Sequence, residues 1–295
     1  MGRVRYEDLP ALLRAADTNS LSGQRRLLLI TRVQLASLVA AAGFGMLSLQ
    51  GWAGDAAAVL AAVAFGTALV TEVYRLKDRP DRLWYTGRAV AESAKTLTWR
   101  YMVGGAPLGL GEVDADRADT RLLDRFRDIA SDVDPASLVP AEGSTDEITC
   151  AMRRARALPL ADRRDLYLRE RLDDQRAWYA DKSRWNAGRS TLWSVGLASL
   201  ELVGLALGIA RAAGLVEVDL LGFAAAVVAA GAAWVQTKQH QGLATAYGIA
   251  SHEIALIRAR AEQEVTEQEW ARFVSDAEEA ISREHTLWRA SRGGG

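Results

Sequence analysis

Two pairs of long apolar segments, about 160 residues apart, dominate the pattern of hydrophobic and polar positions along the chain. Residues 33–54 and 56–71 contain no charge, and residues 191–210 and 220–237 contain a single one. Roughly 20 apolar residues in a helix cross a bilayer core of about 30 Å, and a helix satisfies its own backbone in lipid. The pattern therefore predicts an all-α integral membrane protein. Two transmembrane hairpins, four spans in all, would carry long helical cytoplasmic extensions.

The two halves of the chain repeat one another. A shift of about 162 residues brings the first pair of spans onto the second and Tyr85 onto Tyr247. Three regions are predicted: a first two-transmembrane hairpin with a cytoplasmic helix (1–105), a loop-rich cytoplasmic linker (106–160), and a second hairpin with long cytoplasmic helices (161–295). Both hairpins share one orientation, so the repeat is parallel. Internal repeats are common in membrane proteins that surround a central path.

Local signals predict the ends of the helices outside the spans. Pro80 predicts a break after the second span, and the Gly-Gly-Ala-Pro at residues 104–107 predicts the end of the following helix. Asp162 is expected to cap a helix that runs without interruption into the third span. The fourth span is expected to continue as a helix past Lys238.

Two capping boxes predict further helix starts. Ser144 with Glu147 predicts a helix near residues 146–157, and Thr266 with Glu269 predicts the start of the last helix. The apolar positions of that last helix recur on one face: Trp270, Phe273, Ala277, Ile281 and Trp288.

Basic residues are concentrated on one side of the spans. The segments next to the spans carry Arg25, Arg26, Arg32, Arg75, Lys77, Arg79, Arg82, Arg88, Arg184, Arg189 and Lys238, whereas the first turn has no basic residue and the second has only Arg211. By the positive-inside rule, both turns lie outside and both termini are cytoplasmic. Abundant Arg with scarce Lys is typical of a GC-rich bacterial genome. We therefore expect a multi-pass protein of the bacterial inner membrane.

Composition excludes several classes of function. A net charge of −1 gives no basic field for nucleic acid, and a single Cys150 allows neither an internal disulfide nor a cysteine-based metal cluster. No HExxH spacing, nucleophile elbow or phosphate loop is present. We expect no enzymatic activity, no cofactor and no metal.

Glu201, in the middle of the third span, is the leading candidate for function. A carboxylate at membrane depth is costly unless it faces a bundle interior, water or a partner. Two interpretations remain open. A ring of Glu201 carboxylates from several subunits would line a cation path, or a protonated or hydrogen-bonded Glu201 would join helices.

Other polar side chains are weaker candidates. Glu72 and Gln236 lie near the cytoplasmic mouths of the spans, where they would shape an ion entrance or act as interfacial caps. Glu92 and Glu253 recur after the second span of each half, and would line a cytoplasmic vestibule or form helix salt bridges. A basic cluster would take an anionic nucleotide or lipid headgroup, or form a solvated helix face: Arg153, Arg154 and Arg156.

Motifs in both halves resemble the SLATT family. In the second half they are residues 167–175 (YLRERLDDQ), Trp178-Tyr179, Lys182 and Asn186, with Glu278, Ile281, Glu284-His285 and Trp288 near the carboxyl end. The first half is similar to a sister branch through Trp84-Tyr85, Arg88, Ala91-Glu92-Ser93, Lys95, Trp99-Arg100-Tyr101 and Pro107. The resemblance covers nearly the whole chain as two fused copies.

The resemblance implies a two-transmembrane effector that associates with nucleotide second-messenger synthases or nucleotide-sensing domains. Such an effector of a bacterial conflict system would oligomerise and perforate the membrane. The family brings no established catalytic residues. With two copies and no separate sensor domain expected, this chain would depart from the common arrangement.

Two functions are therefore in competition. The first is an oligomeric membrane pore or ion channel, an effector of a bacterial nucleotide-signalling or anti-phage defence system. Its partners would be membrane lipid, further copies of the chain, and a nucleotide second messenger or sensor protein. The second is a membrane-anchored scaffold or signalling adaptor without conduction, which the scarcity of polar residues in the spans favours.

Overall fold

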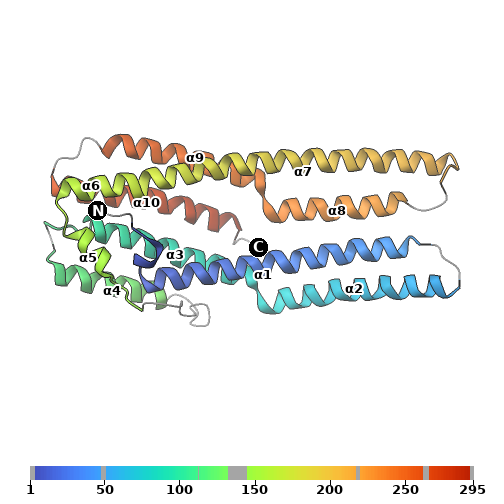
Figure 1. The fold of residues 1–295 in the computed structure, drawn as a ribbon, viewed down its shortest axis with the longest axis horizontal. Helices are drawn as coiled ribbons and strands as arrows, with labels where there is room; N and C mark the ends of the chain where they lie inside the picture. The colour runs from blue at the N-terminus through green and yellow to red at the C-terminus, as the bar shows by residue number, and fades with distance from the viewer. Residues whose placement is uncertain are drawn as a thin grey trace. The chain divides into compact units, whose positions relative to one another are not determined.

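The computed structural model describes residues 4–47, 51–111, 113–131, 145–216, 220–261 and 266–292, with the side chains of 283–292 left out of the description. Within these ranges every regular element is helical, as predicted. The helices, labelled in Figure 1, are α1 (Ala11–Gly45), α2 (Trp52–Asp78), α3 (Pro80–Val103), α4 (Ala115–Ser131), α5 (Cys150–Arg156), α6 (Leu160–Tyr167), α7 (Asp174–Ala212), α8 (Leu220–Lys238), α9 (His240–Arg260) and α10 (Glu267–Arg292).

The chain divides into two compact units. We call them the apolar unit, formed by Arg25–Pro80 and Lys182–Ala246, and the polar unit, formed by Met1–Gln24, Asp81–Asp181 and Tyr247–Gly295. Each half of the chain contributes to both units. The structural division therefore separates membrane-type helices from polar helices, and cuts across the sequence repeat.

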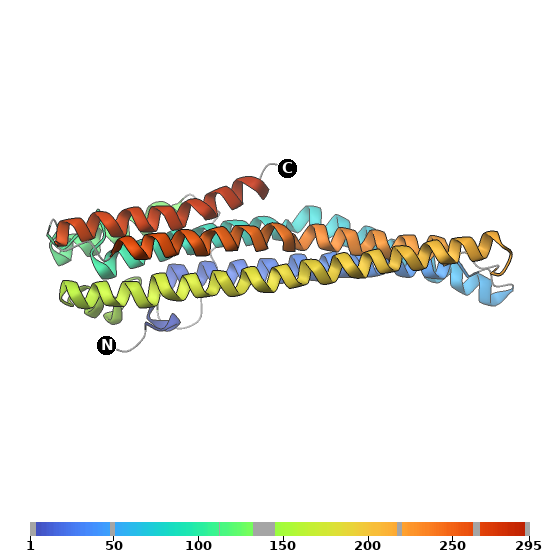
Figure 2. The same ribbon diagram turned by 90° about the horizontal axis from the view of Figure 1, so that it is seen from above.

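The apolar unit contains two antiparallel helical hairpins, α1 with α2 and α7 with α8 (Figures 1 and 2). Four helices in the described part of the chain are long and apolar enough to cross a membrane, and these are the four predicted spans. Large apolar side chains on their surface are exposed, including Val63, Phe65, Val195 and Leu205. A helix that is apolar all round is typical of a membrane span. The prediction of a four-span membrane protein is confirmed.

Both halves break the helix after the second span at a residue with a left-handed backbone. Arg79 has φ of 41° and Gln239 has φ of 49°. Their amides donate to Arg75 O at 3.1 Å and Val235 O at 2.8 Å, closing the last turns of α2 and α8. The break before Pro80 was predicted. The helix of the fourth span continues past Lys238 as predicted, but with a break that was not predicted: Gln239 ends α8 and α9 starts at His240.

The helix leading into the third span is continuous, as predicted. It starts at Leu160 after Pro159, so Asp162 lies in its first turn and does not cap it. A π-helical segment, Leu168–Asp173, joins α6 to α7. No local signal in the sequence indicated this extra-wide turn.

The described residues of the predicted linker contain the helices α4 and α5. α4 buries Ala118, Leu122 and Phe126. The capping box predicted for the helix near 146–157 is wrong, because Thr149 caps α5 by accepting from the Met152 amide at 3.2 Å. Glu147 instead accepts from the Leu12 amide at 3.0 Å, and Ser144 lies outside the described residues.

The core of the polar unit is built around aromatic side chains on elements from both halves. Trp270, Phe273, Ala277 and Ile281 of α10 are buried as predicted, whereas the side chain of Trp288 is outside the described residues. The capping box at the start of α10 is confirmed: the Glu269 amide donates to Thr266 Oγ1 at 3.2 Å, and the Thr266 amide to Glu269 Oε2 at 3.0 Å.

Side chains from other helices satisfy the carboxyl end of α3. The Val103 carbonyl accepts from Trp270 Nε1 at 2.8 Å and from Arg163 Nη1 at 2.7 Å. Gly105 donates to Arg100 O at 2.7 Å, the bond that closes a Schellman motif, and Gly104 has φ of +76°. The predicted glycine-rich helix end is confirmed.

Gly104→Ala is expected to lower the free energy of unfolding of the polar unit by about 1–3 kcal/mol, because a side chain is strained at this φ. An added Cβ would lie 2.6 Å from Arg163 Nη1 and 2.6 Å from Leu110 Cδ1. Urea denaturation of the purified chain, followed by tryptophan fluorescence, measures the change. Gly111→Ala is the matched control, since nothing lies within 4 Å of a Cβ there. Equal stability of the two variants would contradict the prediction.

Candidate functional site

Glu201 lies on the exposed surface of the apolar unit, in the middle of the membrane-type part of α7. Its neighbours Leu202 and Leu205 are also exposed, so the carboxylate faces outward from a single chain. Ser194, seven residues earlier, is exposed on the same helix face. Among the described residues Glu201 has no ion-pair partner. Of the predicted site residues, Glu201 is the one that is exposed in the middle of a span.

Small residues explain how α7 and α8 pack. A Cβ added to Gly204 would lie 3.5 Å from Ala224 Cβ, and one added to Gly208 would lie 3.2 Å from Leu221 Cδ2. These glycines let the two backbones of the second hairpin approach each other closely. The face that holds Glu201 is therefore positioned by packing within the hairpin.

Glu72 holds the first hairpin together. Its Oε2 accepts from Gln34 Nε2 at 2.8 Å and its Oε1 from Arg75 Nη2 at 2.8 Å. The Gln34 bond connects α1 with α2, the Arg75 bond lies within α2, and together they use both carboxylate oxygens. Gln236 is exposed on α8. The structure thus gives Glu72 a helix-joining contact and leaves Gln236 on the surface.

The predicted vestibule residues are on different helices of the polar unit. Glu92 of α3 pairs with Arg88, with Oε1 3.5 Å from Nη2 and i,i+4 spacing. This is the helix salt bridge that was the alternative interpretation. Glu253 is exposed on α9. The described contacts do not bring the two carboxylates together.

The predicted basic cluster divides among three environments. Arg153 pairs with Asp119 at 2.9 Å, and Arg154 is exposed. Arg156 is buried and donates to Tyr101 O at 2.9 Å and Leu108 O at 2.8 Å. Burial lowers the pKa of Arg156, with the phenol of Tyr101 opposing the shift. The three arginines therefore do not form one anion-binding surface.

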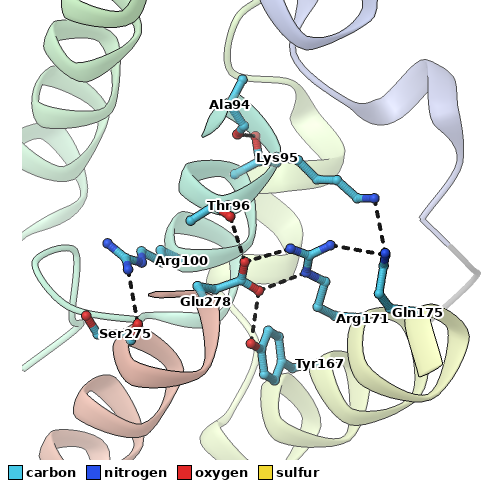
Figure 3. Close-up of polar contacts among 10 residues, drawn as sticks. Ala94, Lys95, Thr96, Arg100, Tyr167, Arg171, Gln175, Ser275 and Glu278 are labelled. Atoms are coloured by element: carbon cyan, nitrogen blue, oxygen red, sulfur yellow. Dashed lines mark hydrogen bonds and ion pairs between the residues drawn. The ribbon is translucent and has the colours of Figure 1, made fainter. Parts of the chain in front are cut away.

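Sequence reasoning missed a fully buried ion pair among the described residues, the Glu278 cluster (Figure 3). Glu278 on α10 accepts from Thr96 Oγ1 at 3.0 Å, Tyr167 OH at 2.9 Å, and Arg171 Nε and Nη2 at 2.8 Å and 2.7 Å. The Arg171 side chain is 1% exposed and that of Glu278 is 0% exposed. Four donors fully occupy the carboxylate, so the cluster joins helices and presents no free group for chemistry.

A signal for this cluster was present in the sequence. Glu278 lies next to Ala277 on the apolar face of α10, and Arg171 lies beside the buried Leu172. A charge on an apolar helix face requires a buried partner of opposite charge. In the described part of the chain no group of three or more His, Cys, Asp or Glu residues is arranged to hold a metal ion.

Two family models match the chain. The SMODS and SLOG-associating 2TM effector domain 3 matches residues 10–164, and the SMODS and SLOG-associating 2TM effector domain 1 matches residues 167–288. Comparison with curated proteins and with solved structures finds no match. The matches agree with the four apolar helices in two hairpins, and with the resemblance seen in the sequence motifs. The chain belongs to the SLATT family of two-transmembrane effector domains and carries two such domains fused in one polypeptide.

Proposed function

We propose that this protein assembles from several copies in the bacterial inner membrane and forms an ion-conducting pore. It would act as the effector of a nucleotide-signalling or anti-phage defence system. The observation that carries the proposal is the exposed Glu201 at mid-span. The family's description as effector domains that associate with SMODS and SLOG domains supports the biological setting.

The cost of exposing Glu201 favours assembly. An ionised carboxylate at the bilayer centre costs about 2.5–3.5 kcal/mol even on the lower scales. A second copy that covers the Glu201 face would shield the carboxylate from lipid and so remove this cost. A ring of several copies would also bring the Glu201 carboxylates and Ser194 hydroxyls around one water-filled path. One chain alone has too few polar positions in its spans to line such a path.

The composition of the polar unit supports one orientation for both hairpins. Met1–Gln24, Asp81–Asp181 and Tyr247–Gly295 belong to one compact unit, which favours the return of both hairpins to the same side of the membrane. The basic residues that flank the spans favour the cytoplasm as that side. Both termini would be cytoplasmic, and a nucleotide second messenger or sensor protein would act on the polar unit.

Disulfide crosslinking tests assembly through the Glu201 face. In a Cys150→Ser background the chain has no other cysteine, so a single Ser194→Cys reports only contacts between copies. Crosslinked dimers are expected in membranes treated with a mild oxidant. Ala224→Cys is the matched control, because Ala224 is buried against α7 and is expected to stay monomeric. Equal crosslinking of both variants would contradict assembly through this face.

Ion flux tests conduction. Purified protein in liposomes is expected to pass cations in preference to anions, and Glu201→Gln is expected to reduce that preference because the variant removes the charge but keeps the shape. Unchanged ion selectivity in a conducting preparation would eliminate the proposed role of Glu201.

A membrane-anchored scaffold is the second candidate. The scarcity of polar side chains in the spans and the extensive hydrogen bonding of the polar unit favour it. Crosslinked oligomers that pass no ions, with or without a nucleotide second messenger, would assign the scaffold function.

A further inference from the structure

The apolar unit contains an open groove that neither the proposed pore nor the family match explains. Its volume is about 610 Å³, within the roughly 300–1,000 Å³ typical of ligand pockets. On α1 the lining residues recur at i, i+3, i+4 and i+7, so the groove follows that helix for two turns: Arg32, Leu35, Ala36 and Val39. α7 and α8 supply the other walls, with Leu200 and Val227 among them.

One end of the groove is cationic. The Arg32 guanidinium lies 5.1 Å from the centre of the Trp234 ring, and the Lys238 ammonium lies 5.7 Å from it. Arg32 and Trp234 both line the groove. Arg189 belongs to the same group of charges, because it and Arg32 are the charged groups that act on Lys238.

Arg32, Arg189 and Lys238 lack a counterion of their own in the part of the chain that the structure describes. Among the described residues, none of them forms an ion pair with a carboxylate. They lie at the end of the apolar unit where α1 and α7 enter it and α8 leaves it. Like charges held close together repel, so an anion that binds between them gains from all three. Arg189 and Arg32 also stand over tryptophan rings, Trp185 and Trp234 respectively, as is common at a membrane interface.

We propose that this groove binds one anionic phospholipid. The phosphate would lie between Arg32 and Lys238 beside the Trp234 ring, and one acyl chain would lie along Leu35, Val39 and Leu200. Charge complementarity and the continuity of the apolar walls with the cationic end support this ligand. Basic pockets between transmembrane helices on the cytoplasmic side are suited to anionic headgroups.

The groove also provides a way to block the acyl chain without disturbing the fold. Gly196 lines the groove, and a Cβ added there meets nothing within 4 Å. Gly196→Leu should therefore fill the groove, and leucine is also a better helix former than glycine. Gly188→Leu is the matched control on the same helix, since its Cβ also meets nothing within 4 Å but Gly188 does not line the groove.

Native mass spectrometry of the full chain in detergent tests the proposal. With palmitoyl-oleoyl phosphatidylglycerol, one lipid is expected to stay bound per chain, and palmitoyl-oleoyl phosphatidylcholine is expected to be lost. Arg32→Gln with Lys238→Gln should weaken retention of phosphatidylglycerol by about 30-fold, the equivalent of about 1 kcal/mol for each basic residue. The matched charge control is Arg25→Gln with Arg26→Gln, two exposed arginines on α1 outside the groove. Gly196→Leu should also release the lipid.

Glycerol phosphate, which has the headgroup phosphate without acyl chains, separates a lipid site from a phosphate site. It is expected not to displace the bound phosphatidylglycerol from the unmodified protein. Displacement by glycerol phosphate would overturn the acyl-chain part of the proposal. Equal retention of phosphatidylcholine and phosphatidylglycerol by the unmodified protein would overturn the role of the cations, and this comparison requires no variant to fold.

Discussion

Glu278→Ala is expected to lower the free energy of unfolding of the polar unit by about 3–5 kcal/mol, because removal of one partner leaves the other charge buried without compensation. Arg171 is 1% exposed and donates two hydrogen bonds to Glu278. The same substitution leaves the Tyr167 and Thr96 hydroxyls without the acceptor that each now has. Since domains are typically stable by about 5–15 kcal/mol, the loss is a large part of the total.

Hydrogen–deuterium exchange of the full chain in detergent measures this effect within the polar unit. Faster exchange is expected in α3 and α10, the helices that carry Thr96 and Glu278, with α8 of the apolar unit unchanged. Glu279→Ala is the matched control, since it removes the same charge from the adjacent exposed position. If both variants exchange alike, the Glu278 cluster does not stabilise the polar unit.

The transmembrane hairpins could be predicted because a long apolar segment in lipid has to satisfy its own backbone hydrogen bonds, which it does as an α-helix. Residues 33–54 and 220–237 contain no charge, and no other compact structure satisfies their backbone in a bilayer. The ends of the helices were predictable where proline, glycine or a capping box set them, as at Pro80, Gly104 and Thr266. In each case the cause lies within a few residues of the effect.

The features that were not predicted depend on contacts between distant segments. Gln239 adopts its left-handed backbone without a neighbouring proline or glycine, so its own sequence gives no reason for a break. Thr149 was not identified as the cap of α5 because Glu147 has a better partner in the Leu12 amide, 135 residues away. The Glu278 cluster likewise joins residues up to 182 positions apart. Patterns among neighbouring residues carry no information about contacts across such sequence separations.

The same distinction between local and long-range causes applies to the site predictions. Glu201 was identified because a lone charge in a span is visible in the sequence, and the structure leaves it exposed. The anion site predicted at Arg153, Arg154 and Arg156 depended on sequence proximity, but in a helix adjacent residues point in different directions. The structure instead brings together Arg32 and Lys238, which are more than 200 residues apart.

The two halves of the chain interlock within the polar unit. Residues of the first half form hydrogen bonds and packing contacts with residues of the second half. The Ala106 amide donates to Ala271 O at 2.8 Å, Arg100 Nη2 to Ser275 O at 3.0 Å, and Trp270 Nε1 to Val103 O at 2.8 Å. Trp99 from the first half also packs against Tyr167 from the second half, with ring centres 6.0 Å apart. Since each half supplies partners for buried polar groups of the other, neither half can satisfy its own core alone.

Separation of the chain into two fragments should therefore abolish folding of the polar unit unless both fragments are present. A cut after residue 138 falls between α4 and α5 and leaves every described helix intact. Fragment 1–138 alone would expose the Val103 end of α3, and fragment 139–295 alone would expose Trp270 and the apolar face of α10. Each is expected to enter the membrane through its own hairpin but to be degraded rapidly by protease in the polar segments.

Coexpression of the two fragments is expected to restore protease resistance and copurification through a tag on one fragment, because all the contacts across the repeat can form again. Coexpression with Glu278→Ala in the second fragment should reduce recovery of the pair, whereas Glu279→Ala should not. Protease resistance of either fragment alone would mean that its part of the polar unit folds without the other fragment. The contacts from Val103, Ser275 and Ala271 would then be incidental to folding. Resistance only on coexpression would mean that the polar unit folds as one body built from both fragments.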